Sequence, residues 1–165
     1  MKSSVRFGLL AMALSLNYSC SKEDDDNGNP TLSSFLSGNF NVTRADYNGS
    51  VSNSFGNIPT SGTGTETEGF FLFEPFTKTT TYALSTKMEV SAGGQTNQYP
   101  IYAGGAGTFE IINENSFRIK DAVSGTRVYN VSDRTASGIT LSTGYQADTL
   151  GGNADLSLSI YLSKD

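Results

Sequence analysis

The sequence of 165 residues has no histidine, no tryptophan and a single cysteine, Cys20. Without histidine it forms neither a His-dependent catalytic triad nor a histidine metal site, and one cysteine forms no intramolecular disulfide. Glu66 and Glu68 share one face if their segment is extended, as an acid–base pair would, but two solvated glutamates in a Thr-rich segment explain them better. We therefore expect no enzymatic activity, no catalytic residue, no metal site and no cofactor.

Long apolar segments are also missing. The most apolar stretch, Phe7–Leu16, follows the basic residues Lys2 and Arg6 and is about half as long as the roughly 20 residues that a membrane-spanning helix needs. A positive segment followed by a short apolar segment is typical of a secretory signal peptide. We expect residues 1–19 to be removed, leaving a mature chain without a transmembrane helix.

The end of this leader places the small residue Ser19 directly before Cys20, with Leu16 four residues before the cysteine. This segment resembles a bacterial lipobox, and the resemblance implies that Cys20 receives diacylglycerol on its sulfur and a further acyl chain on its amine. The alternative is a chance thiol within a leader that is cleaved elsewhere. Several acyl chains anchor a protein stably where one chain is marginal.

The segment after the cysteine, residues 20–30, contains four adjacent acids, Glu23–Asp26. Such a run cannot bury apolar surface, so we expect a solvated, disordered tether. Its position resembles the lipoprotein export signal of Bacteroidetes, which implies a lipid-anchored protein of the outer membrane that faces the cell exterior. The alternative is a simple spacer.

Negative charge limits the choice of partners. The formal net charge is −5, and it becomes −7 once Lys2 and Arg6 are lost with the leader. Binding nucleic acid requires a basic surface, and the remaining Lys and Arg residues are scattered singly, so we do not expect a nucleic-acid partner. Residues 31–165 are enough for one domain with its own core.

The pattern of this domain is all-β. Only Leu32–Leu36 shows helical spacing, whereas apolar residues alternate with polar ones in many short runs. The expected strands fall within residues 40–43, 69–76, 82–90, 99–103, 107–112, 117–122, 127–132, 139–142 and 156–162. Asn48-Gly49 and Gly104-Gly105 are among the predicted turns, and Asn48–Glu68, rich in Ser, Gly and Thr, is predicted to be a long loop or lid.

Short links between consecutive strands favour an antiparallel meander that closes into a β-barrel of about eight to ten strands, with a β-sandwich as the alternative. Residues Leu36–Val42, Leu-Ser-Gly-Asn-Phe-Asn-Val, are similar to the opening of lipocalin-like domains, with Phe40 in the place of the usual tryptophan. The resemblance implies a barrel that binds a small apolar molecule or a glycan.

Residues 70–76 hold the densest apolar cluster, with Phe71 and Phe73 on one face of an extended strand and Phe70 and Leu72 on the other. Core explains one apolar face, and the second must meet a loop, a partner or a ligand. The candidate ligand or partner residues are Phe71, Phe73, Phe76 and Tyr82. The competing hypothesis is an accessory interaction subunit of an outer-membrane uptake or envelope complex, and an internal cavity would favour the ligand hypothesis over it.

A modification site is also predicted. Asp148-Thr149-Leu150 resembles the acceptor sequence of the Bacteroidetes O-glycosylation system, which implies a glycan on Thr149.

Overall fold

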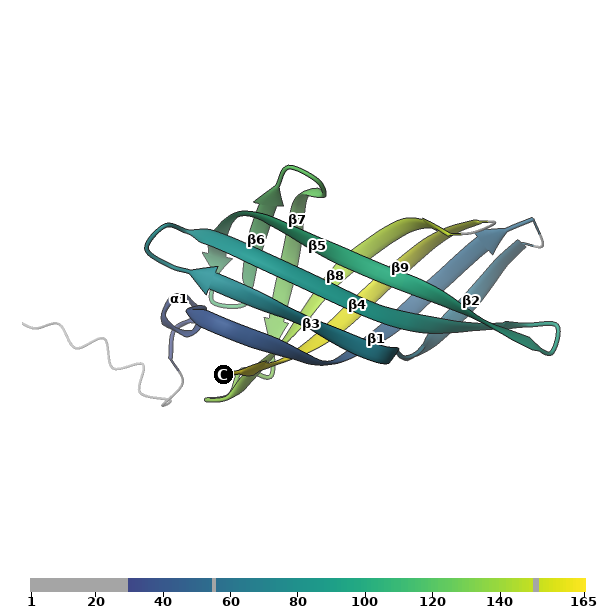
Figure 1. Ribbon diagram of the computed structural model, residues 1–165, viewed down its shortest axis with the longest axis horizontal. Coiled ribbons are helices and arrows are strands. Elements are labelled where there is room, and N and C mark those ends of the chain that lie inside the picture. The colour runs from purple at the N-terminus through teal and green to yellow at the C-terminus, as the bar shows by residue number, and fades with distance from the viewer. Residues whose placement is uncertain (1–29, 55, 150–151) are drawn as a thin grey trace, which may run out of the picture.

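The computed structural model describes residues 30–54, 56–149 and 152–165, so the predicted leader, Cys20 and the tether as far as Asn29 lie outside the described part. The described residues form a short helix and nine strands (Figure 1): α1 (Leu32–Phe35), β1 (Gly38–Asn53), β2 (Gly56–Thr63), β3 (Thr65–Glu74), β4 (Thr79–Ala92), β5 (Gln95–Asn113), β6 (Ser116–Asp121), β7 (Gly125–Ser132), β8 (Gly138–Thr149) and β9 (Gly152–Lys164).

All strands are antiparallel and belong to one meander sheet, which closes because β1 also pairs with the last strand, β9. The predicted all-β meander is thus confirmed, and it forms a closed, barrel-like ring. Within the described ranges, no helix is long and apolar enough to cross a membrane.

Strand β1 is the centre of the closure. Its first residues pair with β3, its second half pairs with β2, and nearly its whole length pairs with β9. The arm formed by β2 and β3 is interrupted at Gly64, whose N–H donates to the carbonyl of Ala45 at 2.7 Å. An irregularity in the β1–β9 register between Val42 and Arg44 changes the inward-facing residues from Phe40 and Val42 to Ala45 and Tyr47.

The predicted loop at 48–68 is wrong, because this segment contains the end of β1, all of β2 and the start of β3. Gly49 sits where a Cβ atom would lie 2.1 Å from the carbonyl oxygen of Asp155 in β9. Glycine is needed there for close strand approach and not for a turn. Strand β2 lacks apolar alternation because nearly all of its side chains are exposed, Thr60 being its one buried residue.

The predicted turn at Gly104-Gly105 is also wrong, since β5 runs through it as one strand of 19 residues. The two strands expected at 99–103 and 107–112 are therefore one. Gly107 again marks close approach, because a Cβ atom there would lie 2.2 Å from the carbonyl oxygen of Lys120 in β6.

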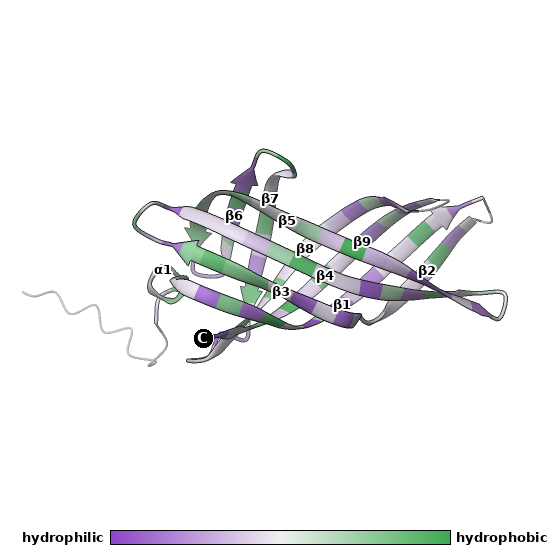
Figure 2. Cartoon of the chain, viewed as in Figure 1, coloured by the Kyte–Doolittle hydropathy of each residue, from purple (hydrophilic) through white to green (hydrophobic). Residues whose placement is uncertain are grey.

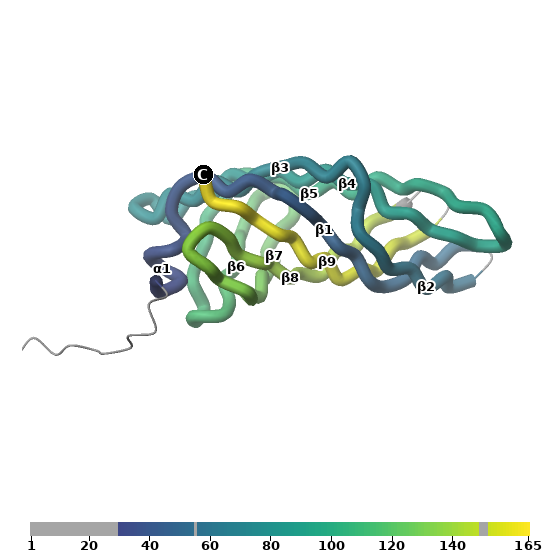
Figure 3. Tube along the Cα trace, turned by 90° about the horizontal axis from the view of Figure 1, so that it is seen from below, coloured from purple at the N-terminus to yellow at the C-terminus, as the bar shows by residue number. Residues whose placement is uncertain are grey.

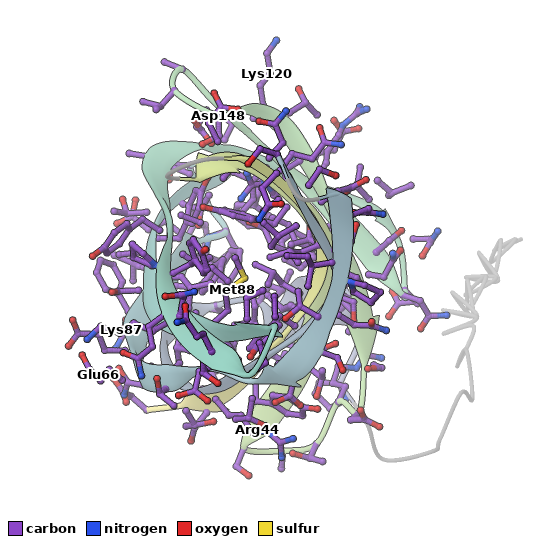
Figure 4. All side chains as sticks on the ribbon, turned by 90° about the vertical axis from the view of Figure 1, so that its right-hand side faces the viewer. Arg44, Glu66, Lys87, Met88, Lys120 and Asp148 are labelled. Atoms are coloured by element: carbon purple, nitrogen blue, oxygen red, sulfur yellow. The ribbon has the colours of Figure 1, made fainter. Side chains whose placement is uncertain are left out.

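Alternation places the core inside the ring. In β9, Leu156, Leu158, Ile160 and Leu162 are buried while the residues between them are exposed or half-buried, as the sequence predicts. Figure 2 shows this as coloured bands along the strands, with an unbroken apolar stretch at the end of β3. Figure 4, a view along the ring, places Met88 inside it and Arg44, Lys87 and Lys120 outside.

The two ends of the ring differ. One, which we call the α1 end, carries α1, the β3–β4 and β5–β6 turns and the C-terminus, whereas the other, the hairpin end, carries the β1–β2, β4–β5 and β8–β9 hairpins (Figures 1 and 3). Helix α1 closes the first end by burying Leu32, Phe35 and Leu36. The N–H of Leu32 donates to the carboxylate of Glu114 at 2.7 Å, which fixes α1 to the β5–β6 turn.

Towards the hairpin end, two tyrosine hydroxyls hold the β4–β5 ribbon to the rest of the sheet. The hydroxyl of Tyr47 in β1 accepts from the N–H of Glu89 at 2.9 Å and donates to its carbonyl at 3.1 Å. The hydroxyl of Tyr145 in β8 makes the same pair of contacts with Tyr102 in β5, at 3.4 and 3.2 Å. Each tyrosine hydroxyl thus bonds both the N–H and the C=O of one residue at an edge of the ribbon.

The outer edge of β5 is otherwise open over much of its length. Strand β6 pairs with β5 only from Gly107 onward, and no other described strand pairs with this edge. Peptide groups two residues apart on a strand face the same way, so the nitrogen of Pro100 points to the same edge as the N–H of Tyr102. Proline has no N–H to offer there, which is where an edge strand tolerates it.

Candidate functional site

The structure does not bring the four predicted ligand or partner residues to one face. Phe71, Phe73 and Tyr82 lie inside the ring, with at most 2% of each side chain exposed, whereas Phe76 is fully exposed at the β3–β4 turn. Of the two predicted glutamates, Glu66 forms an ion pair with Lys87 at 2.5 Å and Glu68 lies exposed beyond a register shift between β3 and β4. Thr149 is the last residue of β8.

Aromatic rings fill the ring interior near the α1 end. Phe73 contacts the rings of Phe40, Phe109 and Phe117, with centroids 5.2–5.8 Å apart and nearly perpendicular planes. Tyr82 stacks on Phe71, and Tyr129 stacks on Phe117. These distances and angles are those of a packed aromatic core. The space that the ligand hypothesis would use at this level is occupied by the protein's own side chains.

Asp121, only 7% exposed, is the one buried acid among the described residues. Burial acts to raise its pKa, but the N–H groups of Ser124 and Val123 and the hydroxyl of Tyr82 all donate to its carboxylate and together hold the pKa below the usual range. Burial, reinforced by Asp121, raises the pKa of Tyr82. Burial also raises the pKa of Tyr129 to about 12. This cluster closes the β6–β7 turn and fastens it to β4, which accounts for the buried charge structurally.

A groove on the outer face of β3, β4 and β5 is the strongest candidate for a binding site. We call it the outer groove, and it is lined by Asn41, Glu68, Gly69, Phe70, Ala83, Leu84, Ser85, Tyr102, Ala103 and Gly104. Small residues form the floor of the groove, because strand register places Ala83 and Gly104 beside Phe70. The neighbouring row aligns Ser85 with Tyr102.

Two aromatic side chains form the walls of the outer groove. Phe70 is 36% exposed and Tyr102 is 66% exposed, so both present ring surface to solvent. The backbone of Tyr102 is held by the Tyr145 hydroxyl, which positions its side chain. Few polar side chains line the groove, namely Asn41, Glu68 and Ser85.

Two other surface depressions are more polar. One, on β5, β6 and β7, contains the Arg118–Glu110 ion pair at 2.7 Å, and the other lies between β8 and β9 beside Asp148 and Asp155. Neither combines two exposed aromatic rings with a floor of small residues.

The sequence pattern singled out Phe71 and Phe73 as candidate site residues, but these lie in the core, on the opposite face of β3 from the outer groove. Period two had already placed Phe70 and Leu72 opposite the core face of β3, where an unexplained apolar surface was expected. Ala83 and Gly104 carried no such signal, because Gly104 looked like a turn residue and the alignment of Ala83 beside it depends on strand register. The chain matches no protein-family model and no curated protein sequence.

Proposed function

We propose that the chain is a non-enzymatic lipoprotein of the outer membrane, anchored through Cys20 and facing the cell exterior, whose domain binds an envelope protein through the outer groove. The observation that carries this proposal is the pairing of exposed Phe70 and Tyr102 across a floor of small residues. Protein interfaces are enriched in aromatic side chains, and two exposed aromatic rings line this groove.

The filled interior favours this accessory role over ligand binding inside the ring. A lipocalin-like carrier needs an internal apolar cavity, and the rings around Phe73 occupy that space near the α1 end. The lipocalin-like resemblance of Leu36–Val42 stays a proposal about ancestry. Fold alone does not determine function, so the groove and not the barrel supports the assignment.

Photo-crosslinking in the cells that make the protein tests the groove. A photoreactive phenylalanine analogue at position 102 should form one defined protein adduct, and that adduct should disappear in Phe70→Ser. The matched control is Val128, 45% exposed on β7, where the same analogue should form no such adduct. A small molecule or glycan co-purifying with the native protein, with no protein adduct at 102, would instead favour the ligand hypothesis.

The anchor is tested separately. Cys20→Ala should move the protein from the membrane fraction to the soluble fraction and abolish incorporation of labelled fatty acid. If the Cys20→Ala variant stays in the membrane fraction and the parent protein takes up no labelled fatty acid, the proposed lipid anchor is wrong. The proposal for the outer groove does not depend on that result.

We also propose that Thr149 carries an O-linked glycan, independently of the lipid anchor and the outer groove. Intact-mass analysis of the native protein should show a glycan mass that is lost in Thr149→Ala. An unmodified native protein would refute it.

A further inference from the structure

Phe76 is a fully exposed aromatic residue at the tip of an ordered turn. The Thr79 hydroxyl donates to the Glu74 carboxylate at 2.7 Å, and the N–H of Phe109 donates to the carbonyl of Lys78 at 2.9 Å. The hydroxyl of Thr77 also lies 2.6 Å from that of Thr79. These contacts fix the turn from within, so Phe76 is held away from the core instead of folding back onto it.

This turn lies at the α1 end, the end at which the described chain begins (Figures 1 and 3). Pro30 follows Cys20 by ten residues. Even fully extended, a segment of this length spans no more than about 35 Å. An acyl anchor on Cys20 would therefore keep the α1 end close to the bilayer, where a short linker produces an effective concentration in about the millimolar range.

The side chains around Phe76 suit a lipid surface. Lys78 is exposed two residues further along, and Ile112, 48% exposed, lies next to the last residue of β5 at the same end. Aromatic side chains favour the headgroup level of a bilayer, and lysine complements its phosphates. Glu74, the nearest acid in the sequence, accepts hydrogen bonds from the hydroxyls of Thr77 and Thr79.

We propose that the α1 end rests on the membrane surface, with Phe76 inserted at the boundary between headgroups and acyl chains and Lys78 at the lipid phosphates. This inference rests on the proposed acylation of Cys20. Docking in this way gives the anchored domain a fixed orientation, with the hairpin end pointing away from the bilayer and the outer groove standing at its side.

An isolated exposed apolar residue is ordinary on a protein surface, so position is the deciding observation. Val123 provides the comparison, because it is 86% exposed at the tip of the β6–β7 turn. That turn lies at the opposite end of β6 from the β5–β6 turn of the α1 end. A membrane that merely attracts exposed apolar residues would not distinguish the two positions.

The absence of tryptophan and the single cysteine make the test direct. The chain from Cys20 to Asp165, carrying Phe76→Trp, is coupled through its thiol to phosphatidylcholine vesicles that contain a maleimide-headgroup lipid. On coupling, the emission of the introduced indole should shift to the blue, become quenched by brominated phosphatidylcholine and lose several-fold of its quenching by iodide. The same chain with Val123→Trp should show none of these changes.

Unshifted emission from Phe76→Trp, or equal shifts in Phe76→Trp and Val123→Trp, would overturn the docking. Because the coupling is chemical, the result does not depend on acylation in the cell. A native protein without acyl chains would refute the anchor, whereas a coupled Phe76→Trp chain whose indole stays exposed to solvent would refute the docking alone.

Discussion

The half of the ring next to α1 and the half that carries the long hairpins share the long strands β1, β4, β5, β8 and β9 but are held together differently. In the first, Phe71, Phe73 and Phe117 pack with their neighbours, and α1 covers the end. In the second, the β4–β5 ribbon is free of strand partners along much of both edges and is held by the hydroxyls of Tyr47 and Tyr145. One hydrophobic core extends through both halves, aromatic packing is concentrated in the first, and in the second a few directional hydrogen bonds also hold the ribbon in place.

The largest effect is expected from the packed half. Phe73→Ala should lower the free energy of unfolding by about 3–5 kcal/mol, because it removes a ring that contacts four others and leaves a cavity. Equilibrium unfolding in urea measures this. Phe73→Leu should cost clearly less, and a loss below about 1 kcal/mol for the alanine variant would show that this half is not the stabilising core.

The second-largest loss of stability is expected in the hairpin half, from the loss of a tyrosine hydroxyl. Tyr47→Phe should cost about 1–3 kcal/mol, since it leaves the N–H of Glu89 without its partner, while the carbonyl of Glu89 keeps the hydrogen bond from the Thr60 hydroxyl. Tyr145→Phe should cost less, because its contacts with Tyr102 are longer.

Hydrogen exchange localises this second effect. Exchange of the Glu89 amide should accelerate in Tyr47→Phe. Tyr99→Phe is the control, because the Tyr99 hydroxyl makes no hydrogen bond to any described residue. If the Glu89 amide exchanges at the same rate in Tyr47→Phe and Tyr99→Phe, the Tyr47 hydroxyl does not protect it.

A smaller effect, about 1 kcal/mol at neutral pH, is expected from Asp121→Asn, which keeps an acceptor but loses the charge. The folded pKa of Asp121 lies below its unfolded value, so its contribution is complete above the unfolded pKa of about 3.9 and is lost as pH falls through the lower folded pKa. Unfolding free energies measured at several pH values should therefore fall less steeply below about pH 4 in Asp121→Asn than in the parent. Asp155→Asn, at an exposed position in β9, is the matched control and should change the unfolding free energy at neutral pH by no more than about 0.5 kcal/mol.

The smallest effect is expected at the β3–β4 turn, which we propose to contact the membrane. Phe76→Ser should change the unfolding free energy by no more than about 0.5 kcal/mol in solution, because the side chain is fully exposed. A larger loss would mean that Phe76 serves the core and would weaken its assignment to a lipid surface.

The difference between the two halves also explains which strands the sequence predicts well. Alternation identified the core residues of β9 and the inward positions of β4, because one face of each strand meets packed side chains. It failed for β2, whose side chains are nearly all exposed, and at Gly49 and Gly104, which lie inside strands. A strand held by backbone bonds and a glycine needed for close approach carry no periodic signal.

The candidate site was visible only in part for the same reason. Phe70 follows from period two within one strand, but the floor beside it depends on which residues of β4 and β5 lie opposite one another. Register over a 19-residue strand follows from the whole closed sheet and not from a local pattern. A local pattern therefore predicts one wall of the groove, and the register of the sheet determines its floor and the second wall.

The open edge of β5 has a consequence for crowding. Chains anchored to one membrane, as we propose, meet in two dimensions, where an unpaired strand edge would tend to recruit the same edge of a neighbour. Pro100 offers no donor at that edge, and Tyr145 already occupies both hydrogen-bonding groups of Tyr102. This part of the edge would thus be a poor template for strand pairing between neighbouring molecules in a dense layer.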